Sequence, residues 1–311
     1  MSAPPIKPHA AADLFARAHP DDFTGDKSCA ECHPSTVNEF AASPHAAFMQ
    51  DPKLPVEQRG CEGCHGPGKI HQADKDAQVI SFTKMTPAES NAACLRCHAQ
   101  TMSESHWKRT EHARAGLACV TCHQIHPSDE KTREPNAPNK GDVTDAKTNF
   151  FVARRSPKAM LKSEEAQLCA QCHATQAAEF KQAFHHPVPE GRVVCSDCHT
   201  PHPSKDSKVR AGVTYKEKCV TCHNEKAGPF VFEHDPVAGS SGTGCLECHR
   251  PHGANNPMLL VATTRGLCGQ CHTDKLASSH HPGQTCWSAG CHVSTHGSNI
   301  NPDFLDQSGG R

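Results

Sequence analysis

The twenty cysteines of this chain form ten pairs, and a histidine directly follows the second cysteine of every pair. Nine pairs have the form Cys-x-x-Cys-His, and the tenth, Cys286 and Cys291 before His292, is wider. Two thiols at this spacing can add across the vinyl groups of a haem, and the adjacent histidine can then bind the iron as its proximal ligand. One such motif is a weak signal. Ten motifs that use every cysteine predict ten covalently attached c-type haems.

The predicted attachment residues occupy equivalent positions in the ten motifs. The cysteines are Cys29, Cys32, Cys61, Cys64, Cys94, Cys97, Cys119, Cys122, Cys169, Cys172, Cys195, Cys198, Cys219, Cys222, Cys245, Cys248, Cys268, Cys271, Cys286 and Cys291. The proximal iron ligands are His33, His65, His98, His123, His173, His199, His223, His249, His272 and His292. We interpret the tenth motif as a variant haem site, because the small Ala289 and the permissive Gly290 allow the longer loop to bulge outward.

Two other chemistries use cysteine pairs, and both fit this pattern less well. A tetrahedral zinc site uses Cys-x-x-Cys, but it does not require a histidine directly after every second cysteine. A disulfide scaffold needs no histidine at all. Haem attachment is therefore the favoured interpretation of all ten motifs.

The remaining histidines follow a repeat of five units, each with a motif, a single histidine, a second motif and a further histidine. The units run from Cys29 to His71, Cys94 to His126, Cys169 to His202, Cys219 to His252 and Cys268 to His296. Of 25 histidines, ten are proximal and the repeat supplies ten more, which predicts bis-His ligation of every iron. The predicted distal ligands are His45, His71, His112, His126, His186, His202, His234, His252, His281 and His296.

Three choices among neighbouring histidines stay open at this level. They are His185 or His186, His280 or His281, and His106 or His112. The sequence does not tell which distal histidine serves which haem. His19, in the Pro- and Ala-rich N-terminal arm, is a further candidate distal ligand, although a plain arm residue is favoured there.

The composition leaves little for an ordinary core. Aromatic residues are 5% of the 311 residues, and prolines number 24. We therefore expect the haems themselves to form the core, so that the apo-chain does not fold stably. The formal net charge of −1 understates the acidity of the holo-protein, because every haem adds its propionates. We find no nucleic-acid motif and expect no nucleic-acid partner.

The expected fold class is a multihaem cytochrome c, mostly coil with short α-helices and little or no β structure. It would be an elongated haem wire of five di-haem repeats, with helices over 35–42, 164–170 and 175–183. The predicted parts are an N-terminal arm at 1–26, a four-haem part at 27–126, a haem-free linker at 127–168, a six-haem part at 169–301 and a tail at 302–311. No apolar run is long enough to cross a bilayer, and no export signal is visible, so we expect a mature or truncated chain.

Phrases around the motifs carry a resemblance. They include Ser43-Pro44-His45-Ala46, Gly60-Cys61-Glu62-Gly63-Cys64-His65-Gly66-Pro67-Gly68, Cys195-Ser196-Asp197-Cys198-His199, Gly228-Pro229-Phe230 and His296-Gly297-Ser298-Asn299. With them the chain, from about Lys27 to Asn301, resembles the decahaem periplasmic cytochromes of the MtrA, PioA, MtoA and DmsE type. The widened tenth motif and the long segment from Pro127 to Ser163 differ from that family's pattern.

The resemblance implies low-spin, bis-His haems and a place in the periplasm at the outer membrane. Family members sit inside an outer-membrane β-barrel porin and pass electrons across the membrane. A porin-like protein and periplasmic and extracellular electron-transfer cytochromes are thus the expected partners, for extracellular metal reduction or iron oxidation. The alternative is a soluble periplasmic electron shuttle or store. A multihaem reductase is disfavoured, because six-coordinate irons leave no open position, and we expect no enzymatic activity.

Overall fold

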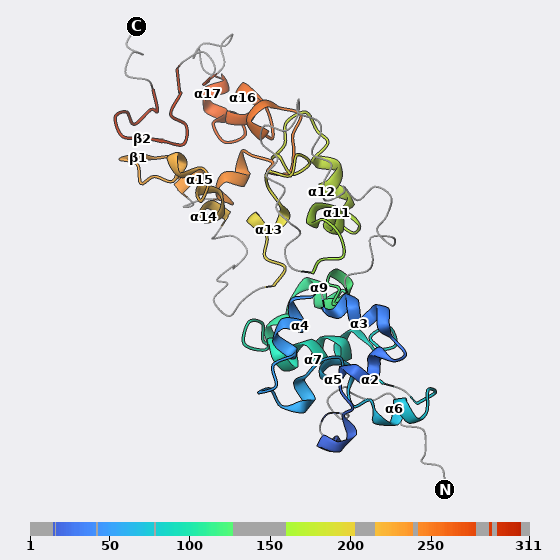
Figure 1. Ribbon diagram of the computed structural model, residues 1–311. Helices are drawn as coiled ribbons and strands as arrows, with labels where there is room; N and C mark the ends of the chain where they lie inside the picture. The colour runs from blue at the N-terminus through green and yellow to red at the C-terminus, as the bar shows by residue number, and fades with distance from the viewer. Residues whose placement is uncertain are drawn as a thin grey trace, which may run out of the picture. The chain divides into compact units, whose positions relative to one another are not determined.

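The computed structural model describes residues 15, 17–41, 43–77, 79–126, 160–202, 215–238, 242–277, 286–287 and 291–305. In Figure 1 these residues form short helices joined by coil, with very little strand. The fold class expected from the sequence, mostly coil with short α-helices and little β structure, is confirmed. The elongated form stays a prediction.

Most of the regular structure is short α-helix. The α-helices are α2 (Asp26–Ala30), α3 (Pro34–Ala41), α4 (Pro44–Met49), α5 (Glu62–His65), α6 (Lys69–Ala73), α7 (Pro87–His98), α8 (Glu104–Trp107), α9 (Glu111–Arg114), α10 (Cys119–Cys122), α11 (Glu165–Ala170), α12 (Ala174–Glu179), α13 (Cys195–Cys198), α14 (Tyr215–Val220), α15 (Asp235–Ala238), α16 (Thr264–Cys268) and α17 (Thr273–Ala277). The 3₁₀ turns are η1 (Pro20–Asp22), η2 (Val56–Gln58), η4 (Asn224–Lys226), η5 (Gly244–Glu247) and η6 (Pro257–Leu259). The strands are β1 (Phe232–Glu233) and β2 (Gly297–Ser298).

The chain divides into two compact units. Among the described residues, the first unit comprises 15–126, 160–168 and 200–202, and the second comprises 169–199 and 215–305. The first unit therefore contains the first four cysteine motifs, and the second contains the other six. His202 belongs to the first unit, although its repeat begins in the second.

Helix α7, with 12 residues, carries the third motif at its C-terminal end. Its start has a capping box: the Thr86 hydroxyl accepts from the Glu89 amide at 3.3 Å, and the Glu89 carboxylate accepts from the Thr86 amide at 2.8 Å. Pro87 occupies the first helical position, where its missing amide hydrogen costs nothing. The Cys94 motif is thereby positioned by a well-started helix.

Two of the three helices expected from the sequence match the structure closely, and the third ends earlier than expected. Helices α3 and α11 lie within about a residue of the expected bounds, but α12 ends at Glu179 rather than at residue 183. The reason is tertiary. After the helix, Phe184 pairs with Ala254 through two backbone hydrogen bonds of 3.1 and 2.8 Å, which requires extended chain. Local sequence favoured more helix than this long-range pairing allows.

The side-chain core of the first unit is small. It centres on Phe40, Ala46 and Met49, with Cys64 and Ile125 packed against them. This cluster joins α3 and α4 to a haem-motif cysteine. The expectation that haems supply most of the apolar interior stays a prediction.

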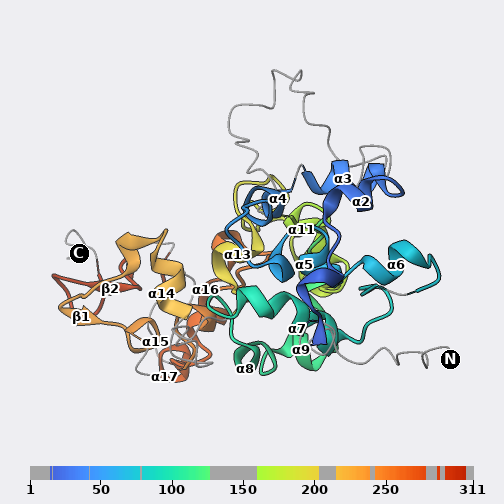
Figure 2. The same ribbon diagram turned by 60° about the horizontal axis from the view of Figure 1, so that its bottom comes forward.

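In the second unit, strands β1 and β2 pair antiparallel, with Phe232 opposite Ser298. Figure 2 shows them side by side, as does Figure 1. Gly297 has φ of 140°, and a Cβ there would lie 2.2 Å from the Phe230 ring, so only glycine fits. This pairing holds the segment after the tenth motif against the loop that carries His234. Among the described residues no helix is both long and apolar enough to cross a bilayer.

Candidate haem sites

A backbone hydrogen bond from the histidine to the first cysteine recurs in the attachment turns. The amide of His33 donates to the carbonyl of Cys29 at 2.8 Å, and the amide of His199 donates to that of Cys195 at 2.8 Å. The same bond recurs in the motifs that begin at Cys61, Cys119, Cys169, Cys219, Cys245 and Cys268. No disulfide joins any of the twenty cysteines, all of which lie in the described ranges.

The widened tenth motif keeps this bond. The amide of His292 donates to the carbonyl of Cys286 at 2.9 Å, across two more residues than in the other nine motifs. The His292 Nδ1 is also anchored, on the carbonyl of Asp303 at 2.6 Å. The extra residues thus leave the attachment turn intact. The bulge expected at Ala289 and Gly290 lies outside the described residues.

Eight proximal histidines each face one predicted distal histidine. The ring centroids are separated by 6.4 Å in His33–His71, 5.9 Å in His45–His98, 6.2 Å in His65–His126, 5.6 Å in His123–His202, 6.3 Å in His186–His223, 6.0 Å in His199–His252, 6.3 Å in His234–His272 and 6.2 Å in His249–His296. Two imidazoles that bind opposite sides of one metal at about 2.0–2.1 Å have centroids about 6 Å apart. The side chains present therefore fit a haem c, with two thiols beside one imidazole and a second imidazole facing it.

Hydrogen bonds at Nδ1 fix the tautomer of many of these rings. A backbone carbonyl can only accept, so Nδ1 carries the hydrogen and Nε2 keeps the lone pair that a metal needs. The carbonyl partners are Ile80 for His65 at 2.7 Å, Ala77 for His71 at 2.7 Å, Pro251 for His186 at 2.5 Å, Thr295 for His234 at 2.9 Å and Met258 for His249 at 2.7 Å.

Burial keeps several of the rings neutral. Desolvation lowers the pKa of five predicted ligands, and a facing histidine lowers it further; these are His45, His65, His199, His202 and His296. The neutral imidazole is the form that binds a metal. The site therefore favours the protonation state that ligation requires.

His185 and His186 differ in what their rings contact. Both ring nitrogens of His185 are engaged by the protein: Nδ1 donates to the Gln182 carbonyl at 2.8 Å, and Nε2 lies 3.1 Å from the Glu190 carboxylate. His186 instead faces His223. The structure therefore favours His186 as the candidate ligand.

For the remaining predicted ligands the roles stay predictions. His112, His173 and His292 are described, and His112 contributes to the lowered pKa of His202. His280 and His281 lie outside the described residues. The preference for His112 over His106 likewise stays a prediction.

Neighbouring repeats exchange their distal histidines. Only the pair His33–His71 lies within one repeat, and each of the other seven pairs joins a repeat to the next. His186 of the third repeat faces His223 of the fourth, and His252 of the fourth faces His199 of the third. Each repeat is therefore incomplete without its neighbour.

Consecutive motifs also lie beside one another in chain order. Within repeats, the first cysteines of the two motifs interact: Cys29–Cys61, Cys94–Cys119, Cys219–Cys245 and Cys268–Cys286. Between repeats, the second cysteines interact: Cys64–Cys97, Cys198–Cys222 and Cys248–Cys271. The two kinds of junction alternate along the chain.

Contact between two cysteine thiols shifts the pKa values of both. A hydrogen bond between the Cys94 and Cys119 side chains raises the pKa of Cys94 and lowers the pKa of Cys119 to about 7. The same arrangement raises the pKa of Cys219 and lowers the pKa of Cys245 to about 6. These shifts show that the side chains of the two first cysteines lie in direct contact in each pair.

Two polar side chains hydrogen-bond one motif to the next, and they were not identified from the sequence. The Asp26 carboxylate accepts from the Cys61 amide at 2.8 Å, and the Asn91 side chain accepts from the Cys119 amide at 2.7 Å. Each stands three residues before the first cysteine of its own motif. That shared position was the signal that would have identified them.

A buried carboxylate within the second motif also connects two segments by hydrogen bonds. Glu62 is 5% exposed and accepts from three backbone amides: Thr24 at 3.0 Å, Gly25 at 2.7 Å and Gly68 at 2.7 Å. These hydrogen bonds satisfy the oxygen atoms of the buried Glu62 side chain. Glu62 therefore ties the chain before the first motif to the turn after the second.

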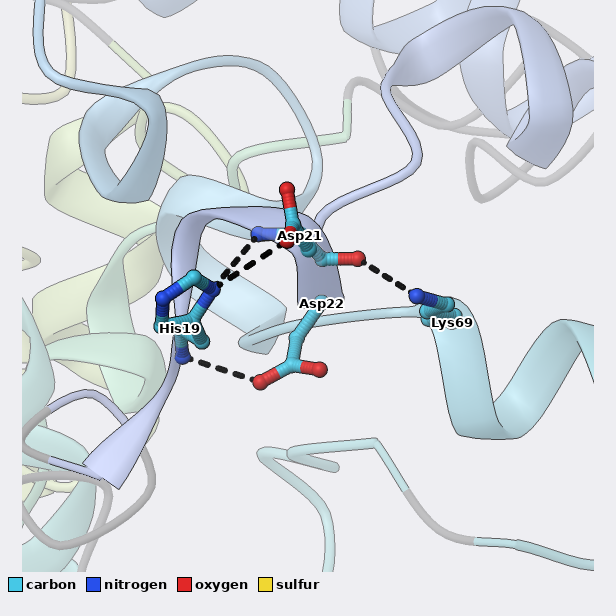
Figure 3. Close-up of polar contacts among 4 residues, drawn as sticks. All are labelled: His19, Asp21, Asp22 and Lys69. Carbon is cyan, nitrogen blue, oxygen red and sulfur yellow. Dashed lines mark hydrogen bonds and ion pairs between the residues drawn. The ribbon is translucent and has the colours of Figure 1, made fainter.

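His19, the alternative ligand in the N-terminal arm, has a capping role. Figure 3 shows its ring beside Asp21 and its amide donating to Asp22 at 2.9 Å. The His19 side chain is 74% exposed and Nδ1 lies 3.4 Å from the Asp21 carboxylate. Lys69 of α6 then donates to the Asp21 carbonyl at 3.0 Å, which links η1 to α6. The favoured interpretation, an arm residue rather than an iron ligand, agrees with this placement.

Two family models match parts of the chain. The model described as "Doubled CXXCH motif" matches residues 185–228 and 234–277. The model described as "Cytochrome c-type protein NrfB-like" matches residues 61–144. The first covers motifs of the second unit, and the second begins at the second motif of the first unit.

Three curated proteins are similar. Multiheme cytochrome MtrA of Shewanella baltica (strain OS185) is 30% identical over 185 residues, which are 58% of this chain and 47% of the relative. Cytochrome c-type protein NrfB of Escherichia coli O6:H1 is 27% identical over 34% of this chain and 55% of its own length. Cytochrome c-554 of Nitrosomonas europaea is 30% identical over 30% of this chain and 45% of its own.

This chain spans about half the length of the curated relatives it matches. All three are named as cytochromes, and the doubled motif model covers four of the attachment turns of this chain. Its paired motifs identify the chain as a multihaem c-type cytochrome with covalently attached haem c, and it is similar to MtrA.

Proposed function

We propose that this chain is a decahaem cytochrome that carries electrons across the outer membrane inside a porin-like barrel. The ten motifs of the sequence and the similarity to MtrA support this proposal. The observation that carries it is the series of eight histidine pairs at iron spacing, seven of which link one repeat to the next. The barrel would shield the cytochrome from the hydrocarbon, so the cytochrome itself needs no apolar surface helix.

The haem, when bound, supplies a one-electron ferric/ferrous couple. The chain would hold each iron with two imidazoles, such as His65 and His126, and would keep these rings still. Nδ1 anchors such as His65 on Ile80 and His234 on Thr295 keep each ring in one tautomer and orientation. Two fixed ligands leave no position for a substrate. We therefore propose an electron carrier and not an enzyme.

The order of the sites follows from the cysteine neighbours. Alternating contacts between first cysteines, as at Cys94 and Cys119, and second cysteines, as at Cys64 and Cys97, place consecutive attachment sites side by side within each unit. A path in chain order would keep the transfers between these neighbouring sites of one unit short. Asp26 and Asn91 hold two of these neighbours at fixed separation in the first unit.

The proposed partners are a porin-like barrel and electron-transfer cytochromes on both of its sides, with the chain in the periplasm at the outer membrane. The second candidate is a periplasmic electron shuttle, and the similarity to NrfB and cytochrome c-554 favours keeping it. A shuttle would use the same haem sites without a barrel. The two candidates therefore differ in assembly and not in haem chemistry.

The experiment is fractionation of membranes from the native host, with a high-salt wash followed by mild detergent. Haem staining and intact-mass analysis would follow the cytochrome and count its haems. Co-purification with a β-barrel protein, with ten haems attached, is the expected result. Release of the cytochrome into the periplasmic fraction without a barrel would refute the conduit and leave the shuttle. A mass that corresponds to fewer haems would refute the decahaem assignment.

A further inference from the structure

One candidate histidine ligand differs from the others in the group that accepts the hydrogen bond from its Nδ1. His252 donates from Nδ1 to the side-chain carboxylate of Glu179 at 2.9 Å, whereas the anchors on carbonyl groups engage neutral acceptors. Both side chains are partly shielded, with His252 28% and Glu179 34% exposed. The ring of Phe180 covers His252 edge-on, with centroids 5.4 Å apart. The bond is therefore short, charged and partly screened from water.

Several contacts fix His252 against Glu179. A Cβ on Gly253 would lie 2.0 Å from the Glu179 carbonyl, so only glycine allows this approach. The next residue, Ala254, is held by the two backbone hydrogen bonds with Phe184. The geometry of the carboxylate–imidazole pair is therefore imposed by the backbone on both sides of it.

One other candidate ligand lies near a carboxylate, and the comparison is informative. The Nδ1 of His223 is 3.9 Å from Glu225, which exceeds hydrogen-bond distance, and both side chains are 57% exposed. Among the candidate ligands whose anchors the structure describes, His252 is the one whose Nδ1 is hydrogen-bonded to a side-chain carboxylate. Glu179 thus distinguishes the site of Cys195, Cys198 and His199.

We propose that Glu179 is a positioning residue that lowers the reduction potential of the haem attached at Cys195 and Cys198. A carboxylate at Nδ1 pulls the hydrogen away from the ring and makes Nε2 a more basic ligand. A more basic ligand stabilises the ferric state more than the ferrous state, because the ferric ion carries the larger charge. This inference rests on the proposed ligation of that iron by His199 and His252.

The test is a redox titration of the holo-protein, followed by its visible spectrum, for wild type and Glu179→Gln. Glutamine keeps the shape and an acceptor oxygen but removes the charge. Outer partners of metal ligands commonly contribute tenfold or more to metal affinity. A tenfold loss of ferric preference would shift one titration component by about 59 mV to more positive potential. The other components should stay in place.

Glu190→Gln is the matched control, because Glu190 bonds His185 in the same unit, and the structure favours His186 over His185 as the ligand. It should shift no component. The proposal is overturned if Glu179→Gln titrates like wild type, or if Glu190→Gln produces the same shift. His252→Ala tests the underlying ligation separately: it should convert one haem to a high-spin signal in electron paramagnetic resonance. If all haems stayed low-spin, the ligation itself, and not the role of Glu179, would be wrong.

Discussion

Replacing His186 by Ala should free one axial position, whereas replacing the adjacent His185 should free none. His186 faces His223 with centroids 6.3 Å apart, and its Nδ1 is held on the Pro251 carbonyl at 2.5 Å. His185 has both nitrogens engaged by Gln182 and Glu190. The two substitutions remove the same side chain from neighbouring positions, so their comparison isolates ligation from any general disturbance of the loop.

The expected fraction of high-spin haem follows from the number of haem sites. With ten motifs in the chain, His186→Ala should turn one haem in ten high-spin, and the other nine should keep their low-spin signals. The backbone pairing of Phe184 with Ala254 does not involve the imidazole, so the fold of the second unit should be retained. Haem attachment at Cys219 and Cys222 should also persist, because it is covalent.

The assay is electron paramagnetic resonance of the oxidised holo-protein, integrated against total haem. His186→Ala should show a high-spin signal of about a tenth of the haem, scaled to the ten motifs, and His185→Ala should show none. A high-spin signal from His185→Ala alone would refute the assignment. If His186→Ala stayed low-spin while the double variant became high-spin, His185 would replace it as ligand, which would contradict its proposed confinement by Glu190.

Three further predictions concern contacts around the sites. The bonds to the Gln182 carbonyl and to Glu190 raise the pKa of His185, and His185 lowers the pKa of Glu190. The charge-dependent part of their contribution to stability is therefore present between about pH 4.3 and pH 6.5 and is lost above the folded-state pKa of His185 or well below pH 4.3. The neutral ring keeps its bond to Gln182, so His185→Ala should lower the melting temperature more at about pH 5.5 than at about pH 9. Asn91→Ala should leave the Cys119 amide without its acceptor and destabilise the holo-protein by about 1–3 kcal/mol in denaturant unfolding, and an unchanged midpoint would contradict this. Thr86→Ala should cost about 0.5–2 kcal/mol by the same measurement, with Thr86→Ser as the control that keeps the cap.

The sequence determined the chemistry of this protein, because covalent haem attachment depends on residues a few positions apart. The cysteine pairs and the histidine after each pair form local turns, and one backbone hydrogen bond from His199 to Cys195 illustrates how little else such a turn needs. The five-fold recurrence of further histidines also allowed the candidate ligands to be counted without any fold. The prediction of short helices and little strand followed from the segments around the motifs and from the lack of an alternating strand pattern, and it is confirmed.

The tertiary structure decided which ligands face each other and what surrounds them. The exchange of His186 and His252 between repeats depends on a pairing of Phe184 with Ala254, seventy residues apart, and no local pattern encodes it. The same pairing ended α12 early and brought Glu179 onto His252. Spacing along the chain fixes where a haem is attached, whereas the partner of each imidazole depends on contacts between distant segments.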